Sequence, residues 1–273
     1  MFRKPARTCS RGGFTSIFVG TRFGKAIPTI QNPKSKIQNR MPQLQRLVIT
    51  PSQLQDQQIL LTSEQQHYLV RVLRLRQGDR FIAMNGQGQC WLAVLAAKVE
   101  ILEQISIQTE LPVAITLLVA LPKGSGFEDV VRSCTELGVS CIAPVISDRT
   151  LLHPSPQKLE RWRRIATEAA EQSERQIVPA ILDPVPFVTA LSSVVSDRKY
   201  ICVARGNSPH LKDCLQERGQ TIAIATGPEG GWTATEVEAA IAAGFEPVSL
   251  GHRILRAVTA PIVALSVAAA FEG

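Results

Sequence analysis

Short apolar segments separated by turn residues run from Gln45 to about Leu111, and this pattern is typical of β-strands. The strands that it predicts are residues 46–49, 59–61, 80–84, 90–99 and 105–111. The run Asn-Gly-Gln-Gly at residues 85–88 has the composition of a tight turn. We therefore expect a small β-barrel within residues 41–112.

One segment of this region, residues 63–79, has the spacing of a helix instead. Leu69, Val72 and Leu73 form an apolar stripe, and Ser63 with Gln66 three residues later resembles a capping box. Three arginines fall away from the stripe: Arg71, Arg74 and Arg76. Like charges do not help folding but would suit nucleic-acid phosphates. The alternative is a solvated helix end whose cations favour the helix dipole.

After Pro112 the pattern changes to alternating strands and helices. It predicts strands at residues 115–121, 141–146, 199–204, 221–225 and 246–250, and helices at 127–137, 156–174, 209–218 and 233–243. An apolar run from Thr259 to Phe271 ends the chain. This alternation predicts an α/β domain over residues 113–273, with a mostly parallel sheet covered by helices on both sides.

Residues 1–40 lack any such period, and we expect them to form a disordered basic extension. They hold nine Lys or Arg and no Asp or Glu. Acid-poor leaders of this kind can also be organellar transit peptides. The abrupt change of composition at Met41 favours a third interpretation, a start assigned too early, with Met41 as the true first residue.

The net charge of +7 comes from this extension, since 21 basic and 23 acidic residues remain in 41–273. Any case for nucleic-acid binding must therefore rest on local clusters. A hydrophobic share of 45%, without an apolar run of the roughly 20 residues that a membrane span needs, indicates a soluble, cytoplasmic protein without a membrane partner. The six cysteines contain no C-x-x-C pair, so we expect no metal site and no disulfide framework.

Two loops near the C-terminus carry the chemistry. Gly227-Pro228-Glu229-Gly230-Gly231 follows one predicted strand, and residues 250–256 follow another. Ligands of open α/β sheets collect at the carboxyl ends of the strands, where both loops lie. The first loop is neither G-x-G-x-x-G nor a P-loop, and a strand-to-helix turn that needs glycine for its geometry alone would look the same.

Together these loops resemble the RsmE family of SPOUT methyltransferases. The resemblance rests on Gly-Pro-Glu-Gly-Gly, on Leu-Gly-x-Arg-Ile-Leu-Arg at residues 250–256, and on Thr-Ala before the terminal apolar run. It extends to Lys123-Gly124, to residues 135–139 and 168–175, and to residues 72–75 and 78–79 of the N-terminal barrel, so it covers residues 41–273. The family methylates N3 of a uridine in 16S ribosomal RNA of the small subunit.

The resemblance implies an N-terminal PUA-like, RNA-binding barrel and a C-terminal, trefoil-knotted SPOUT domain that works as a homodimer. It implies S-adenosyl-L-methionine as cofactor, bound by Ala204, Arg205, Gly227, Pro228, Glu229, Gly230, Gly231, Leu250, Gly251, Ile254 and Leu255. With the local arginines, it assigns RNA contacts to Arg71, Arg74, Arg76 and Lys123.

The reaction needs a base for the N3 proton or a cation that stabilises the uracil anion. Our candidates are Arg256, Glu171, Arg175 and Glu136. Glu171 and Arg175 lie four residues apart, so an exposed ion pair on one helix is the alternative. Many family members have Glu where this chain has Val258, which keeps open a non-catalytic, RNA-binding ribosome-assembly factor. Another SPOUT specificity, ribose 2′-O-methylation, is a second alternative.

Overall fold

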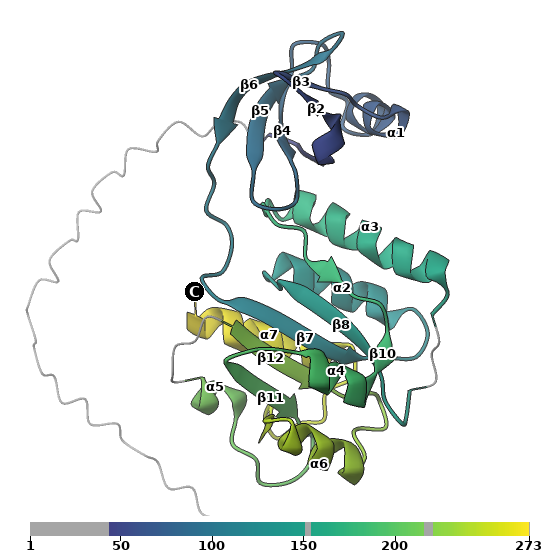
Figure 1. Ribbon diagram of the computed structural model, residues 1–273, viewed down its shortest axis with the longest axis vertical. Coiled ribbons are helices and arrows are strands. Elements are labelled where there is room, and N and C mark those ends of the chain that lie inside the picture. The colour runs from purple at the N-terminus through teal and green to yellow at the C-terminus, as the bar shows by residue number, and fades with distance from the viewer. Residues whose placement is uncertain (1–43, 151–153, 216–220, 273) are drawn as a thin grey trace, which may run out of the picture. The chain divides into compact units, whose positions relative to one another are not determined.

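A computed structural model describes residues 44–150, 154–215 and 221–272 (Figure 1). The extension expected at residues 1–40 therefore lies outside the described residues. The described part contains two β-sheets, of six and seven strands, within one compact unit. None of its helices is long and apolar enough to cross a membrane.

The first sheet is curled and mostly antiparallel. Its strands are β1 (Arg46–Val48), β2 (Leu54–Gln55), β3 (Gln58–Ile59), β4 (Arg80–Met84), β5 (Cys90–Val94) and β6 (Val99–Ile105), in the order β1-β4-β5-β6-β3-β2. The β1–β4 pair is parallel, and the other four pairs are antiparallel. Ile49, Ile59, Leu69 and Phe81 are among the residues that form its core.

The helical segment of this region differs from the prediction in two details. The capping box uses Thr62 and Gln65 instead of Ser63 and Gln66, so α1 spans Ser63–His67. A π-helical turn follows at Tyr68–Val72, and a short 3₁₀ helix precedes at Pro51–Gln53. The π-turn alters the helical spacing, so Leu69 is buried whereas Val72 is 58% exposed. The last strand of the sheet was also placed wrongly, because β6 ends at Ile105 where the prediction began it.

The second sheet is parallel throughout, in the order β10-β8-β7-β12-β11-β13 with β9 beside β8. Its strands are β7 (Ala114–Ala120), β8 (Cys141–Ile146), β9 (Ala180–Ile181), β10 (Val185–Pro186), β11 (Arg198–Cys202), β12 (Thr221–Thr226) and β13 (Glu246–Val248). The central strands β7 and β12 are almost wholly buried, as strands covered on both faces must be. The predicted parallel α/β domain is confirmed.

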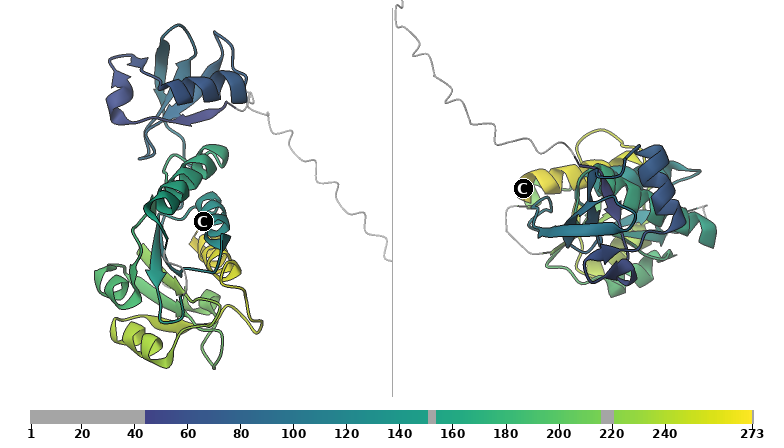
Figure 2. Two further views of the ribbon diagram at one scale, coloured as in Figure 1. Left: turned by 90° about the vertical axis from the view of Figure 1, so that its right-hand side faces the viewer. Right: turned by 90° about the horizontal axis from the view of Figure 1, so that it is seen from above.

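Helices cover both faces of this sheet (Figure 2). One face carries α2 (Gly126–Glu136), α3 (Pro156–Gln172), α5 (Leu211–Cys214) and α7 (Thr259–Glu272). The other carries α4 (Phe187–Ser193) and α6 (Ala234–Ala242). Gly138 ends α2 with a φ of +93°, a left-handed conformation that glycine adopts without strain.

The predicted boundaries in this domain are mostly within two residues of those observed, with two exceptions. The sequence pattern did not show β9, β10 and α4, which are short. The helix predicted over 209–218 is only the four residues of α5 as far as the structure describes it, because residues 216–220 lie outside the described part.

Candidate active site at the carboxyl ends of the central strands

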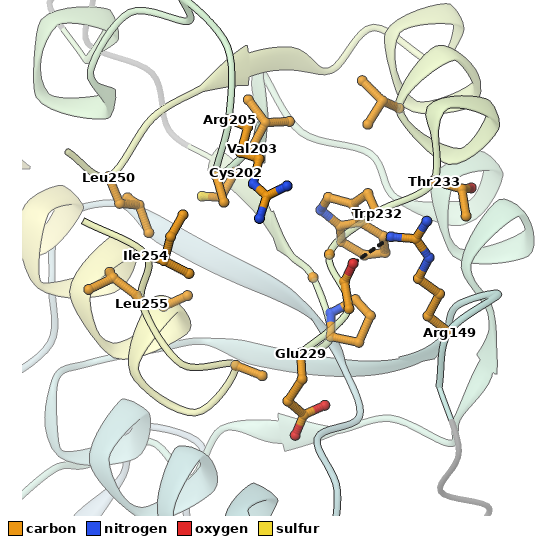
Figure 3. Close-up of a pocket in the computed structure, with 18 of the residues that line it drawn as sticks. Arg149, Cys202, Val203, Arg205, Glu229, Trp232, Thr233, Leu250, Ile254 and Leu255 are labelled. Atoms are coloured by element: carbon orange, nitrogen blue, oxygen red, sulfur yellow. Dashed lines mark hydrogen bonds between the residues drawn. The ribbon is translucent and has the colours of Figure 1, made fainter. Parts of the chain in front are cut away.

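The loops that follow β11, β12 and β13 surround a pocket of about 390 Å³ (Figure 3). These strands are parallel neighbours, in the order β12-β11-β13, so their carboxyl ends meet at one edge of the sheet. Leu250, Ile254 and Leu255 lie on one side of the pocket, and Trp232 and Arg149 lie on the other. The edge that the loops were predicted to share therefore holds a cavity large enough for a small ligand.

All eleven residues predicted to bind the cofactor line this pocket. They are Ala204, Arg205, Gly227, Pro228, Glu229, Gly230, Gly231, Leu250, Gly251, Ile254 and Leu255. The sequence reasoning missed ten further residues of the lining: Arg149, Cys202, Val203, Trp232, Thr233, Ala234, Val237, Arg253, Ala257 and Ala260. Most of them are next to predicted residues in the sequence, and this proximity could have indicated them. Arg149, in contrast, comes from the loop after β8.

The glycines of the loop at 227–231 are required for different reasons. A Cβ on Gly227 would lie 3.2 Å from the indole of Trp232, so this ring packs directly on the backbone. A Cβ on Gly230 would lie 2.9 Å from Cδ of Arg149. Gly231 has open space around its Cβ position but a φ of +68°. Contacts within the protein therefore explain two of the three glycines, and backbone conformation explains the third.

Trp232 is held between this loop and α4. Its ring stacks on Phe187 at 4.2 Å between centroids and 20° between planes. The buried indole Nε1 has no hydrogen-bond acceptor among the described residues. Buried indole N–H groups usually have a partner, so this atom is an unsatisfied donor within the described part of the chain.

The charged groups of the pocket are mostly cations. Arg149, Arg205 and Arg253 are exposed side chains of its lining, and Glu229 supplies a carboxylate. Glu229 Oε1 accepts a hydrogen bond of 2.9 Å from the backbone N–H of Lys123, which draws the turn after β7 to the glycine loop. Burial raises the pKa of the Cys202 thiol to about 12, so this group is neutral at physiological pH.

The loop after β8 and the start of α6 are joined by a polar network. Thr233 caps α6, with its side chain accepting from the backbone N–H of Glu236. Glu236 is 4% exposed and accepts hydrogen bonds from the backbone N–H groups of Asp148 and Thr233 at 2.9 and 2.8 Å. The Thr233 hydroxyl also donates to Asp148. These contacts hold Arg149, the next residue along, beside the glycine loop.

Of the four predicted catalytic residues, Arg256 lies closest in sequence to the pocket, between the lining residues Leu255 and Ala257. Its side chain is exposed. Glu136 is exposed at the end of α2 and is not part of the lining. Val258, adjacent to Ala257, packs on the start of α2, where a Cβ on Gly126 would lie 2.5 Å from Val258 Cγ1. In this chain, therefore, an apolar contact occupies the position of the frequent family glutamate.

Glu171 and Arg175 do not form the exposed ion pair considered as an alternative. Glu171 Oε1 accepts a hydrogen bond of 2.7 Å from the backbone N–H of Val48. Burial is the main cause that raises the pKa of Glu171 to about 7, and the charge of Glu168 adds to it, while the Val48 hydrogen bond acts in the opposite direction. Arg175 is 3% exposed and pairs with Glu110 at 2.6 Å. Neither residue lines the pocket.

Sequence and structure comparisons identify the relatives of this chain. The family model of an RNA methyltransferase domain matches residues 109–269. The family model of an RNA methyltransferase PUA domain matches residues 61–101. A ribosomal RNA small subunit methyltransferase E of Synechocystis sp. is 51% identical over 229 residues, which are 81% of this chain and 76% of the relative.

The chain belongs to the ribosomal RNA small subunit methyltransferase E family. A member from Bacillus subtilis is 33% identical, with 76% of this chain and 87% of the relative covered. The crystal structure of a member from Neisseria gonorrhoeae bound to S-adenosyl methionine has a TM-score of 0.75 at 32% identity. The match covers 82% of this chain and 95% of the chain in that crystal structure. The first sheet is accordingly a PUA-like domain.

Proposed function

We propose that this protein transfers the methyl group of S-adenosyl-L-methionine to N3 of a uridine in 16S ribosomal RNA. The observation that carries the proposal is the pocket itself. Eleven residues from three separate segments, chosen from motifs alone, line one cavity at the carboxyl ends of β11 to β13. Membership of the family and the bound cofactor of the Neisseria relative support the same ligand.

The residues of the pocket fit this cofactor. Leu250, Ile254 and Leu255 offer an apolar wall for an adenine ring, and the glycine loop offers backbone groups for its polar edge. The bound cofactor would supply an activated methyl group on sulfur. The residues of the pocket would hold this group for attack by the uracil nitrogen, and such positioning provides much of the acceleration.

Removal of the N3 proton leaves a negative charge on uracil, which a cation beside the pocket stabilises. We assign this role to Arg256, which is exposed and lies between two residues of the lining. Catalytic roles for the other candidates, Glu136, Glu171 and Arg175, stay predictions. The contacts of Glu171 with Val48 and of Arg175 with Glu110 favour a structural role for these two.

We assign RNA docking to the cations outside the pocket. Arg71, Arg74 and Arg76 are exposed, and no ion pair involves them in the described part of the chain. Arg71 and its neighbours lie within the stretch that matches the PUA model. Lys123 is exposed on the loop that Glu229 holds near the pocket. Exposed cations of this kind suit phosphate contacts, which position the RNA without reading its sequence.

We propose further that the protein has domains at 41–112 and 113–273, with a trefoil knot in the second, and that it acts as a homodimer in the cytoplasm. The apolar character of α7 supports the dimer. Ala264, Leu265 and Ala268 are fully buried, yet its other faces expose apolar side chains such as Phe271 at 47%. A surface helix normally has a polar outer face, so the outer face of α7 suits a second copy of the chain.

The test is to incubate the protein with labelled cofactor and small subunits that lack the modification, and then to identify the product nucleoside. We expect N3-methyluridine. A ribose-methylated product would contradict methylation of N3 and would support ribose 2′-O-methylation instead. Binding of ribosomal RNA without any label transfer would contradict the enzymatic function and would support a non-catalytic assembly factor.

A further inference from the structure

Both sides of the peptide group between Gly230 and Gly231 are held. The N–H of Gly231 donates to the carbonyl of Pro228 at 2.8 Å, which closes the turn of the glycine loop. The carbonyl of Gly230 accepts a hydrogen bond from Nη1 of Arg149, drawn as the dashed line in Figure 3. The first contact is local, whereas the second joins two residues that are 81 positions apart in the sequence. The orientation of this peptide therefore depends on a side chain from another loop.

Arg149 is itself anchored at its backbone. Asp148 exchanges hydrogen bonds with Glu236 and Thr233 at the start of α6. On the other side, the Ser147 hydroxyl lies 2.9 Å from that of Thr150, and the backbone N–H of Ser147 donates to the same oxygen. Ser147, Asp148 and Thr150 are thus fixed on the two sides of Arg149, so its side chain starts from a defined position.

The aliphatic part of the Arg149 side chain also occupies the space beside Gly230 that a side chain at this position would need. A Cβ there would lie 2.9 Å from Cδ and 3.5 Å from Cβ of Arg149. Gly230 is not among the glycines with positive φ, so an alanine would meet no backbone strain at this position. A side chain at Gly230 would therefore force Arg149 to shift, without straining the conformation of the loop.

We infer that Arg149 is a positioning residue of the cofactor pocket, which sets the Gly230–Gly231 peptide and thereby the wall of the pocket formed by the glycine loop. This inference rests on the proposed function for the identity of the ligand. The role differs from a direct contact with the cofactor, because Arg149 acts through the backbone of the loop. Gly230 and Arg149 must then be coupled, since one side chain occupies the space that the other lacks.

The first measurement is amide hydrogen exchange of the ligand-free protein, which does not depend on the identity of the ligand. In Arg149→Ala we expect exchange in the segment 227–232 to become at least several-fold faster than in wild type, because the loop loses its anchor. Arg163→Ala is the matched control. Arg163 is an exposed arginine of α3, paired with Glu160 and Asp183 and outside the pocket. Unchanged exchange in Arg149→Ala would overturn the inference.

The second measurement is calorimetry with S-adenosyl-L-methionine on Arg149→Ala, Gly230→Ala and the double variant. Each single change should weaken binding about tenfold, as expected for the loss of a hydrogen bond to a charged group. The double variant should also be about tenfold weaker, because the alanine methyl fills the space that the arginine stem leaves. A hundredfold loss would mean independent effects and would overturn the coupling.

5′-Methylthioadenosine separates positioning from direct contact, because it lacks the amino-acid carboxylate with which an arginine would pair. A positioning role predicts the same tenfold loss for this probe in Arg149→Ala, whereas an unchanged affinity would overturn it in favour of direct contact. If wild type binds neither probe, the proposed cofactor is wrong, and the hydrogen-exchange result still decides the role of Arg149 in the loop.

Discussion

Replacing Arg175 by Met should strongly destabilise the protein. Every nitrogen of the guanidinium has an acceptor: Nη1 donates to the carbonyls of Thr135 and Val139, both at 2.9 Å. Nε and Nη2 donate to Oε2 of Glu110 at 3.1 and 2.6 Å. The residue is 3% exposed, and this one side chain joins the segment before β7 to the end of α2.

The size of the effect follows from what the substitution leaves behind. Removing one partner of a buried ion pair costs about 3–5 kcal/mol of unfolding free energy. Glu110 is 22% exposed at its side chain and keeps the backbone N–H groups of Gln176 and Ile177 as donors. We therefore expect the lower end of that range, about 3 kcal/mol. In a domain of this size, such a loss lowers the melting temperature by roughly 6–12 °C.

The assay is urea unfolding followed by circular dichroism, with Arg163→Met as the matched control. Arg163 is an arginine in exposed ion pairs, for which about 0–1 kcal/mol is typical. Arg175→Lys should fall between the two, because an ammonium cannot reach the carboxylate and both carbonyls with the geometry of a guanidinium. A stability of Arg175→Met within about 1 kcal/mol of wild type would refute this reasoning. Loss of methyl transfer at such unchanged stability would support the catalytic role predicted from the sequence.

Two further substitutions test the environments of other site residues. Burial raises the pKa of Glu171 from 4.5 to about 7, so the folded state binds more protons than the unfolded state between these values. The unfolding free energy of wild type relative to Glu171→Gln should therefore fall by about 3 kcal/mol as the pH rises through this window. Urea unfolding at pH 5 and pH 8 measures the change, and a pH-independent difference would contradict it. Gly227→Ala should displace the indole of Trp232, which lies 3.2 Å from the new Cβ, and should cost about 1–3 kcal/mol. Wild-type tryptophan emission and melting temperature in this variant would show that the ring does not rest on Gly227.

Local patterns in the sequence were sufficient for most of the fold, whereas the residues of the proposed cofactor site came from the resemblance of two loops to a known family. The apolar runs of β7, β8 and β12 are buried on both faces, so their pattern is unambiguous. The predicted pocket residues all lie in the loops after β11, β12 and β13, and of these strands β12 is one of those buried on both faces. Since parallel strands bring their carboxyl ends to one edge, locating the strands was enough to locate the loops.

Tertiary structure decided the roles of the charged residues. The ion pair of Arg175 with Glu171 that helical spacing suggested is absent, because Arg175 pairs with Glu110, which lies 65 residues away in the sequence. Arg149 carried no signal of its own, because its contact with Gly230 exists only once β8 and β12 lie in the same sheet. Spacing along one helix or strand shows which residues share a face. A long side chain, however, selects its partner among groups that folding brings together, and no local pattern contains that information.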